Sequence, residues 1–192
     1  MVIPEIIEDK TFTKITAETV AGQKRTFENC KFINCDFSYA DFSGVIFIEC
    51  SFDDCNWTLI KLSTTGLQNI MFKGCKLSGA DFSKSNDFLF GVSFDNCILD
   101  NAIFYKKKNK GAKFTDCSMV ETDFTEADLT DVQFINCNLN RAFFDRTVLK
   151  NADLRTSYNF IIDPDSNNIK KARFSVQGLP GLLVKYDIRI EG

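Results

Sequence analysis

The sequence predicts an all-β solenoid, in which short extended segments wind around one elongated core. The first observation is a five-residue period in phenylalanine, at positions 27, 32, 37, 42 and 47. This period fits neither an α-helix, which repeats near 3.6 residues, nor a strand, which repeats at every second residue. The second observation is a small or β-branched residue two positions before most of these phenylalanines. One large and one small inward residue in every five would line one face of a coil, and coils must stack to bury their core.

The repeat runs through most of the chain, and its inward positions can be followed one by one. We call the large residues central residues; they continue in phase to Phe82, slip by two positions, and resume at Leu89. The slip lies in SKSNDFLFG, residues 83–91, and the second block runs to Leu154 with one poor match at Asn109. The residue two positions before each central residue is called the small inward residue.

The order small, polar, Phe or Leu resembles the motif A(D/N)LXX of the pentapeptide-repeat family over roughly residues 25–155. Clear copies are Ala40-Asp41-Phe42, Ala80-Asp81-Phe82, Ala127-Asp128-Leu129 and Ala152-Asp153-Leu154. The resemblance implies a right-handed quadrilateral β-helix, with four pentapeptides in each coil and one on each face. Each coil then takes about 20 residues, and coils stack at about 4.8 Å, the spacing between neighbouring strands.

The cysteines give a check on this coil length. All eight stand at small inward positions, and six of them fall in one column: Cys35, Cys55, Cys75, Cys97, Cys117 and Cys137. We interpret the cysteines as small apolar fillers with free thiols. A straight ladder of thiols offers no tetrahedral zinc site, and parallel side chains on neighbouring coils make poor disulfide geometry.

The chain is interpreted as one pentapeptide-repeat domain, residues 1–192. Its parts are an irregular N-terminal coil at 1–24, regular repeats at 25–158, and a C-terminal cap at 159–192. In the first coil, Phe12, Ile15 and Val20 are the expected inward residues. In the cap, residues 179–186 predict a short helix, and a strand ending in Ile188 and Ile190 is expected to follow.

The cap is also the expected dimerisation segment. An apolar segment that ends a solenoid must cover exposed core, on its own coil or on a second copy. Qnr-type quinolone-resistance members of the family end similarly, so the resemblance implies a homodimer through the C-terminus. The candidate interface residues are Leu179, Leu182, Leu183, Tyr186, Ile188 and Ile190.

Composition lowers the expectation of catalysis. The chain has no histidine, which removes Ser-His-Asp and Cys-His nucleophile systems and the commonest metal ligand. A core packed with Phe and Leu leaves no internal pocket, so we expect no enzyme and no cofactor. The net charge of −3 argues against direct nucleic-acid binding. Without a basic, apolar leader or a run of about 18 apolar residues, we expect a cytoplasmic protein with no membrane partner.

A basic segment, YKKKNKG at residues 105–111, interrupts the repeat. Lys107 and Asn109 fall at inward positions there, and Lys107 shares one face with Asp87, one coil earlier. Because a lone buried lysine is costly, either both segments bulge outward or Asp87 and Lys107 pair; both sites should be neighbours in either case. Candidate partner-binding residues at this corner are Asp87, Lys106, Lys107, Lys108 and Lys110.

The resemblance implies a protein partner, in the sharpest form a type II topoisomerase. Qnr-type and microcin-immunity members protect DNA gyrase as rods with acidic faces that imitate a duplex. Residues 27–104 and 116–154 each carry a net charge of −5 here. A duplex carries one charge per about 1.7 Å, so the mimicry would be of shape more than of charge. Candidate outward acids are Asp36, Asp41, Asp81, Asp123, Asp128 and Asp153.

The alternative is a generic protein–protein interaction scaffold with an unknown partner. It is favoured by apolar residues at outward positions, among them Ile103 and Phe143, which are expected to share one face. The longer loops that project from gyrase-protecting members are replaced here by a two-residue insertion and the basic segment.

Overall fold

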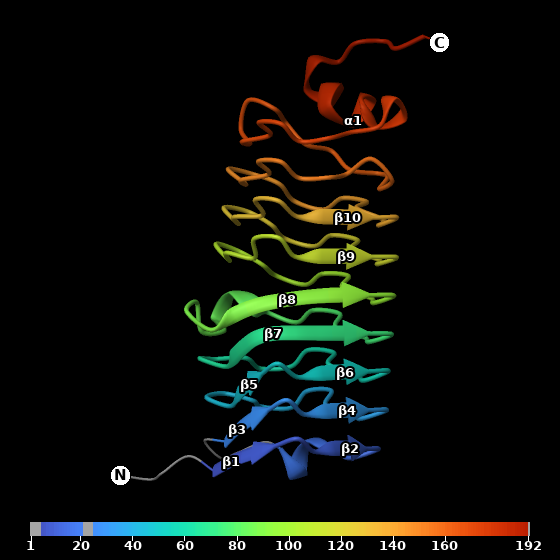
Figure 1. Ribbon diagram of the computed structural model, residues 1–192. Helices are drawn as coiled ribbons and strands as arrows, with labels where there is room; N and C mark the ends of the chain where they lie inside the picture. Colours follow the sequence, from blue (N-terminus) through green and yellow to red (C-terminus); the bar gives the residue numbers. More distant parts are fainter. Residues whose placement is uncertain (1–4, 21–24, 192) are drawn as a thin grey trace.

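The computed structural model describes residues 5–20 and 25–191. The chain winds as a stack of coils from an N-terminal end to a short helix at the C-terminal end (Figure 1). The strands are β1 (Glu5–Glu8), β2 (Thr11–Thr13), β3 (Arg25–Glu28), β4 (Lys31–Ile33), β5 (Ile46–Ile48), β6 (Ser51–Asp53), β7 (Gly66–Lys73), β8 (Phe90–Asp95), β9 (Lys113–Thr115) and β10 (Gln133–Ile135). The helical turns are η1 (Ala17–Thr19), η2 (Phe82–Lys84), η3 (Val176–Gly178), α1 (Pro180–Leu183) and η4 (Val184–Tyr186).

The register of the coils confirms the predicted right-handed quadrilateral β-helix. All strand pairs are parallel, and partners lie twenty residues apart, as in Phe27 with Phe47 and Phe32 with Phe52. The exception is β7 with β8, where the insertion lengthens the offset to 22 or 23 residues. Two faces hold these strands, while the other two are joined by isolated bridges such as Asp41 with Lys61. A twenty-residue offset with four such faces means one pentapeptide on each face.

The corners between faces require a left-handed backbone. The residue two positions after most central residues has a positive φ, for example 52° at Asn29 and at Asn34 and 64° at Gly74. Asn and Gly adopt this conformation at the least steric cost, which explains their recurrence there. The turn therefore fixes the direction of each new face, and the central side chain before it points into the core.

Stacked aromatic rings fill the core along the shaft. Phe52 stacks on Phe32 at 4.7 Å and on Phe72 at 5.1 Å between ring centroids, with planes 9° and 17° apart. Rings on adjacent faces meet edge to face, as Phe52 does with Trp57 at 4.6 Å. Such pairs contribute about 0.5–1.5 kcal/mol each beyond the burial of their area.

The eight cysteines are free and buried, as predicted. They also form hydrogen bonds: the Cys50 Sγ donates to the Phe27 carbonyl at 3.4 Å, and the Cys35 N–H donates to the Cys55 Sγ at 3.4 Å. Burial raises the pKa of the Cys50 thiol to about 12, which keeps it a donor. The thiols thus join neighbouring coils as well as filling space.

The first coil is more regular than predicted. Strands β1 and β2 pair in register with β3 and β4, and the Phe12 ring stacks on Phe32 at 5.0 Å. Val20 is buried, and Phe12 and Ile15 pack against the core, as expected. The predicted irregularity is wrong for residues 5–20; residues 1–4 and 21–24 lie outside the described residues. The repeat was not recognised here because Lys10 stands at a small inward position, where the pattern expects a small residue. Lys10 is exposed at the end of the stack.

The C-terminal turns η3, α1 and η4 close the other end of the stack. Leu182 packs against the core, and the Ile162 N–H donates to the Gly181 carbonyl at 3.0 Å. A Cβ at Gly181 would collide with the Phe160 carbonyl oxygen, so the close approach needs glycine. The predicted short helix is confirmed, but the predicted strand is wrong, since residues 187–191 form none. After the left-handed Asp187 (φ 48°), these residues extend beyond the helix, away from any coil edge that could pair with them (Figure 1).

No helix in the described ranges is long and apolar enough to cross a bilayer.

Candidate interaction surface

The two-residue insertion forms a small loop at residues 86–89. The Asn86 side-chain oxygen accepts hydrogen bonds from the N–H groups of Phe88 at 2.9 Å and Leu89 at 3.2 Å. Phe88 stands at the tip with 93% of its surface exposed. The chain re-enters the core at Phe90, which pairs with Leu67. The prediction that Leu89 is the central residue is therefore wrong, because Phe90 pairs with Leu67 and a register shift between Phe90 and Val92 then sets the offset of 22 residues.

A buried lysine holds this loop from the next coil. The Lys107 Nζ donates to the Asp87 Oδ1 and to the Ser85 carbonyl, both at 2.7 Å, and lies 4.7 Å from the centre of the Phe90 ring. Of the two predicted alternatives, pairing of Asp87 with Lys107 is confirmed. Lys107 is inward and only 1% exposed, whereas Ser85 takes the inward position expected for Asp87. The Asp87 carboxylate reaches the ammonium from the solvent side.

Asn109 also bonds to the backbone of the preceding coil. Its side-chain oxygen accepts from the Val92 N–H at 3.1 Å, and its Nδ2 donates to the Val92 carbonyl at 3.0 Å. Asn109 is buried at a central position, so the amide replaces apolar filling with backbone hydrogen bonds where the register shifts. The signal in the sequence was the pair of polar inward residues, Lys107 and Asn109, one coil after the insertion.

Most of the basic segment is neutralised by nearby carboxylates. The Lys106 Nζ lies 3.4 Å from the Glu126 Oε2, and the Lys110 Nζ lies 3.0 Å from the Asp128 Oδ2. Lys108 is exposed and has no carboxylate partner among the residues that the structure describes. The segment is therefore not the bare cationic patch that its sequence indicates.

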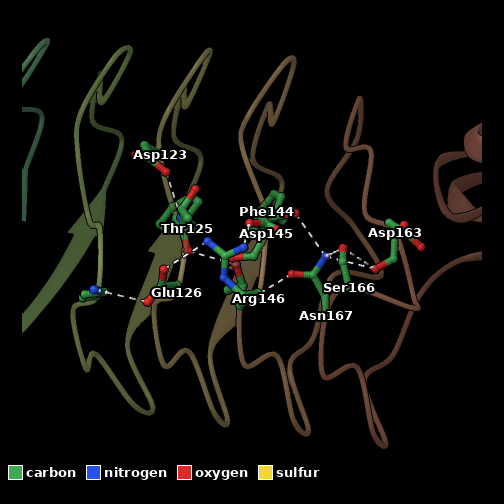
Figure 2. A network of polar contacts seen from close by, with 12 residues as sticks. Asp123, Thr125, Glu126, Phe144, Asp145, Arg146, Asp163, Ser166 and Asn167 are labelled. Carbon is green, nitrogen blue, oxygen red and sulfur yellow. Dashed lines mark hydrogen bonds and ion pairs between the residues drawn. The ribbon is translucent and has the colours of Figure 1, made fainter.

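Figure 2 shows how this charged corner continues toward the C-terminus. Arg146 bridges Glu126 at 3.0 Å and Asp145 at 2.8 Å. The hydrogen bond from Arg146, together with the charge of Lys106, holds the pKa of Glu126 below its usual range. Beside it, the buried Asn167 accepts from the Thr147 N–H at 2.9 Å and donates to the Phe144 and Asp163 carbonyls, both at 3.0 Å. Apart from Lys106, none of these residues was predicted from the sequence as part of a site.

The six candidate outward acids share a structural role. The Oδ1 of each accepts the N–H of the residue two positions later, between 2.8 Å at Asp123 and 3.2 Å at Asp128 and Asp153. The others are Asp36, Asp41 and Asp81, which accept from Ser38, Ser43 and Ser83. Hydrogen bonds from the side chain and N–H of the serine two residues on lower the pKa of Asp36 and Asp41. These carboxylates stabilise the turns that follow them.

The acids do not form one continuous stripe. Asp41, Asp81 and Asp123 lie on one face, on every second coil, with Lys61 and Ile103 in the same row. Ile103 and Phe143 share this face, as expected. The remaining acids belong to three other rows, in which Asp36 pairs with Asn56, Asp128 with Lys108, and Asp153 with Arg173.

The candidate dimer residues differ in exposure. Leu179, Tyr186, Ile188 and Ile190 are exposed by 44–55%, while Leu182 and Leu183 are half-buried. Leu182 packs on its own core, so its side chain serves the cap. Lys185 fastens the cap to the last coil through ion pairs with Asp163, at 2.7 Å, and with Asp165.

Within the described ranges, no three Cys, Asp or Glu side chains converge as metal ligands would.

The chain matches one protein family and is similar to several solved structures. The family described as "Pentapeptide repeat region" matches residues 25–86 and 88–158, so its gap falls at Asp87 in the loop. A search of curated proteins gave no match. Among solved structures, full-length QnrB1, a plasmid-mediated fluoroquinolone resistance protein, is 20% identical over 95% of this chain and 100% of that chain, with a TM-score of 0.41. A trypsin-treated QnrB1 variant gives 19% identity, 98% of each chain and a TM-score of 0.46.

HetL, a pentapeptide-repeat protein involved in heterocyst differentiation regulation in the cyanobacterium Nostoc sp. strain PCC 7120, is also similar. It is 15% identical over 87% of this chain and 86% of that chain, with a TM-score of 0.43.

Proposed function

This chain belongs to the pentapeptide-repeat family, and from that premise we propose that it is a protein-binding scaffold that performs no chemistry itself. The observation that carries the proposal is the filled core. Central and small inward side chains occupy the interior along the described coils, and the buried polar residues among them, such as Lys107 and Asn109, bond to backbone. Recognition is therefore left to the outer faces, corners and ends. Eight free thiols fit a reducing compartment, so we propose that the protein functions in the cytoplasm.

The sharper form of the proposal names a type II topoisomerase, DNA gyrase or topoisomerase IV, as the partner. The long outline of stacked coils and the acidic balance, with a net charge of −3, support it. The engagement of the six aspartates in turns, and the basic residues between them, favour mimicry of duplex shape over mimicry of duplex charge. A partner of another kind is the generic alternative.

A supercoiling assay tests the topoisomerase form. The purified chain is titrated into DNA gyrase acting on relaxed plasmid, with and without a fluoroquinolone. We expect supercoiling to recover in the presence of the drug. Direct binding to gyrase is measured in parallel at low and high salt, where a largely shape-driven contact should weaken only modestly. Absence of recovery, of inhibition by the chain alone and of binding would overturn the topoisomerase form and leave the scaffold with another partner.

We further propose that two copies associate through their C-terminal caps. Exposed apolar side chains gather on this end: Val176, Leu179, Val184, Tyr186, Ile188 and Ile190. Analytical ultracentrifugation of the full chain should give a dimer. The double substitution Ile188→Asp and Ile190→Asp should give a monomer, because it places charges in an apolar contact. Ile6→Asp is the matched control, since Ile6 is similarly exposed (59%) at the opposite end; a monomeric wild-type chain would overturn the proposal.

A further inference from the structure

We propose that the insertion loop is an anchor site for a protein partner that offers an apolar pocket bordered by carboxylates. The loop surface consists of Phe88, Leu89 and Ile46, flanked by Lys84 and Lys108. The inference rests on the proposed scaffold function and names the surface that would serve it. Phe88 is the anchor, and the other four residues define its surroundings.

The exposure of Phe88 is the first step. At 93%, it exceeds that of the other large apolar side chains of the described chain, the next being Val176 at 77%. Elsewhere along the shaft, phenylalanine is the principal filler of the core. A fully exposed Phe adds no packing to the fold, while a protruding aromatic side chain is a frequent hot spot of protein interfaces.

The loop is held in place from both sides, which is the second step. Asn86 fixes the N–H groups of Phe88 and Leu89, and the Leu67 N–H donates to the Leu89 carbonyl at 2.7 Å. Lys107, buried in the next coil, holds Asp87 at 2.7 Å. Because Phe88 lies between these fixed residues, little backbone freedom remains to be lost on binding.

An apolar floor lies beside the anchor. A Cβ at Gly66 would meet the Ile46 Cγ2 at 3.1 Å and the Leu89 Cδ1 at 3.2 Å, so these two side chains close over the glycine. Both are half-buried, and Leu89 directly follows Phe88 in the chain. A partner that takes up the Phe88 ring would therefore cover apolar surface around it as well.

The charges around the loop set the chemistry of the partner. Lys84 precedes the loop on the same coil and Lys108 lies on the next coil; neither is within ion-pair distance of a carboxylate in the described residues. The other lysines of the corner, Lys106, Lys107 and Lys110, are paired. Two uncompensated ammonium groups beside an apolar anchor complement a pocket whose border carries carboxylates. Two cations are too few to give a nucleic acid its usual affinity.

Site-directed crosslinking in cells tests the proposal. Position 88 of the full chain carries benzoylphenylalanine, and position 143, an exposed Phe (56%) on another face, carries it in the control. After irradiation, the crosslinked residues are identified by mass spectrometry. We expect position 88 to crosslink to residues of an apolar pocket bordered by Asp or Glu on another protein. Adducts only with a second copy, lipid or nucleic acid, or adducts no stronger than from position 143, would overturn the proposal.

Affinity for the identified partner gives the second readout. Phe88→Ala should weaken binding of the purified partner at least tenfold, and Phe143→Ala should not. The double variant Lys84→Glu and Lys108→Glu should also weaken binding of the partner, and the loss should grow as the salt concentration falls. Lys170→Glu is the control for added acidic charge. Equal binding by Phe88→Ala would overturn the anchor role.

The same data separate this proposal from the topoisomerase proposal. An adduct with a gyrase or topoisomerase IV subunit supports both. An adduct with a different protein supports the loop site and counts against the topoisomerase form. Where the adduct is with a gyrase or topoisomerase IV subunit, recovery of supercoiling by the Phe88→Ala chain to the wild-type extent supports the topoisomerase form and overturns the loop site.

Discussion

Backbone carbonyl groups in the core accept hydrogen bonds from different side chains in two regions of the molecule. The first region is the regular coils between Phe27 and Phe82, and the second is the altered coils between residues 83 and 111. In the regular coils, a small inward residue with a donor bonds to a carbonyl of the preceding coil, as Cys50 does with Phe27 at 3.4 Å and Thr65 with Phe42 at 2.8 Å. In the altered coils, the longer Lys107 and Asn109 reach across the shifted backbone instead. The comparison teaches that inward donors belong to the fold throughout, and that side-chain length follows the distance to be bridged.

The largest expected effect is on the free energy of unfolding, when a phenylalanine is replaced by alanine in the shaft and in the loop. Phe52→Ala should lower the free energy of unfolding by about 3–5 kcal/mol, because it removes a ring stacked between Phe32 and Phe72 and leaves a cavity. Phe88→Ala should change it by less than about 0.5 kcal/mol, since that side chain is exposed. Urea unfolding followed by circular dichroism measures both; similar losses would contradict the difference between shaft and loop.

The next effect concerns the buried lysine. Lys107→Met should cost about 1–3 kcal/mol, because the Ser85 carbonyl loses its buried donor. Amide hydrogen exchange should also quicken in residues 86–91, which Lys107 holds through Asp87. Lys108→Met is the matched control, because its side chain is exposed and unpaired among the described residues. Unchanged exchange in the loop would show that Lys107 is only a filler.

The smallest expected effect is the difference in acid sensitivity between turns capped by an aspartate, as at Asp36 and Asp41, and the loop capped by Asn86. The pKa values of Asp36 and Asp41 are lowered in the folded state by their serine partners. The stability they contribute is thus fully present above the unfolded carboxyl pKa of about 3.9, and is lost as the pH falls through the lower folded value. The double variant Asp36→Asn and Asp41→Asn should lose less stability between about pH 4 and pH 2. Asn86→Asp should add acid sensitivity at the loop, where the native cap does not titrate; thermal unfolding at each pH measures both.

The sequence predicts the shaft well, because each inward position repeats at a fixed interval. The cysteine column and the stacked phenylalanines follow from that interval alone, and coil length, register and buried thiols are confirmed. Prediction failed where the interval was interrupted. Leu89 and Phe90 are both apolar neighbours of the insertion, so composition cannot say which re-enters the core.

The surface was harder to predict for a different reason. The aspartates that looked available for a partner are engaged by N–H groups two residues away, a role that any outward Asp before a turn can take. Asp87 was expected inward, yet Ser85 occupies that position. The exposure of Phe88 was not predicted, because this residue lies in the insertion, where the five-residue pattern is interrupted.

The recovery of register after the insertion has a consequence for how such a chain can change. Val92 pairs with Ile70 and Phe94 with Phe72, so the coils beyond the loop stack as if the two extra residues were absent from the shaft. The segment before Val92 therefore separates the length of the loop from the geometry of the coils that follow. Segments of different length and composition can be exchanged there by mutation or by design, while the same core is retained on either side.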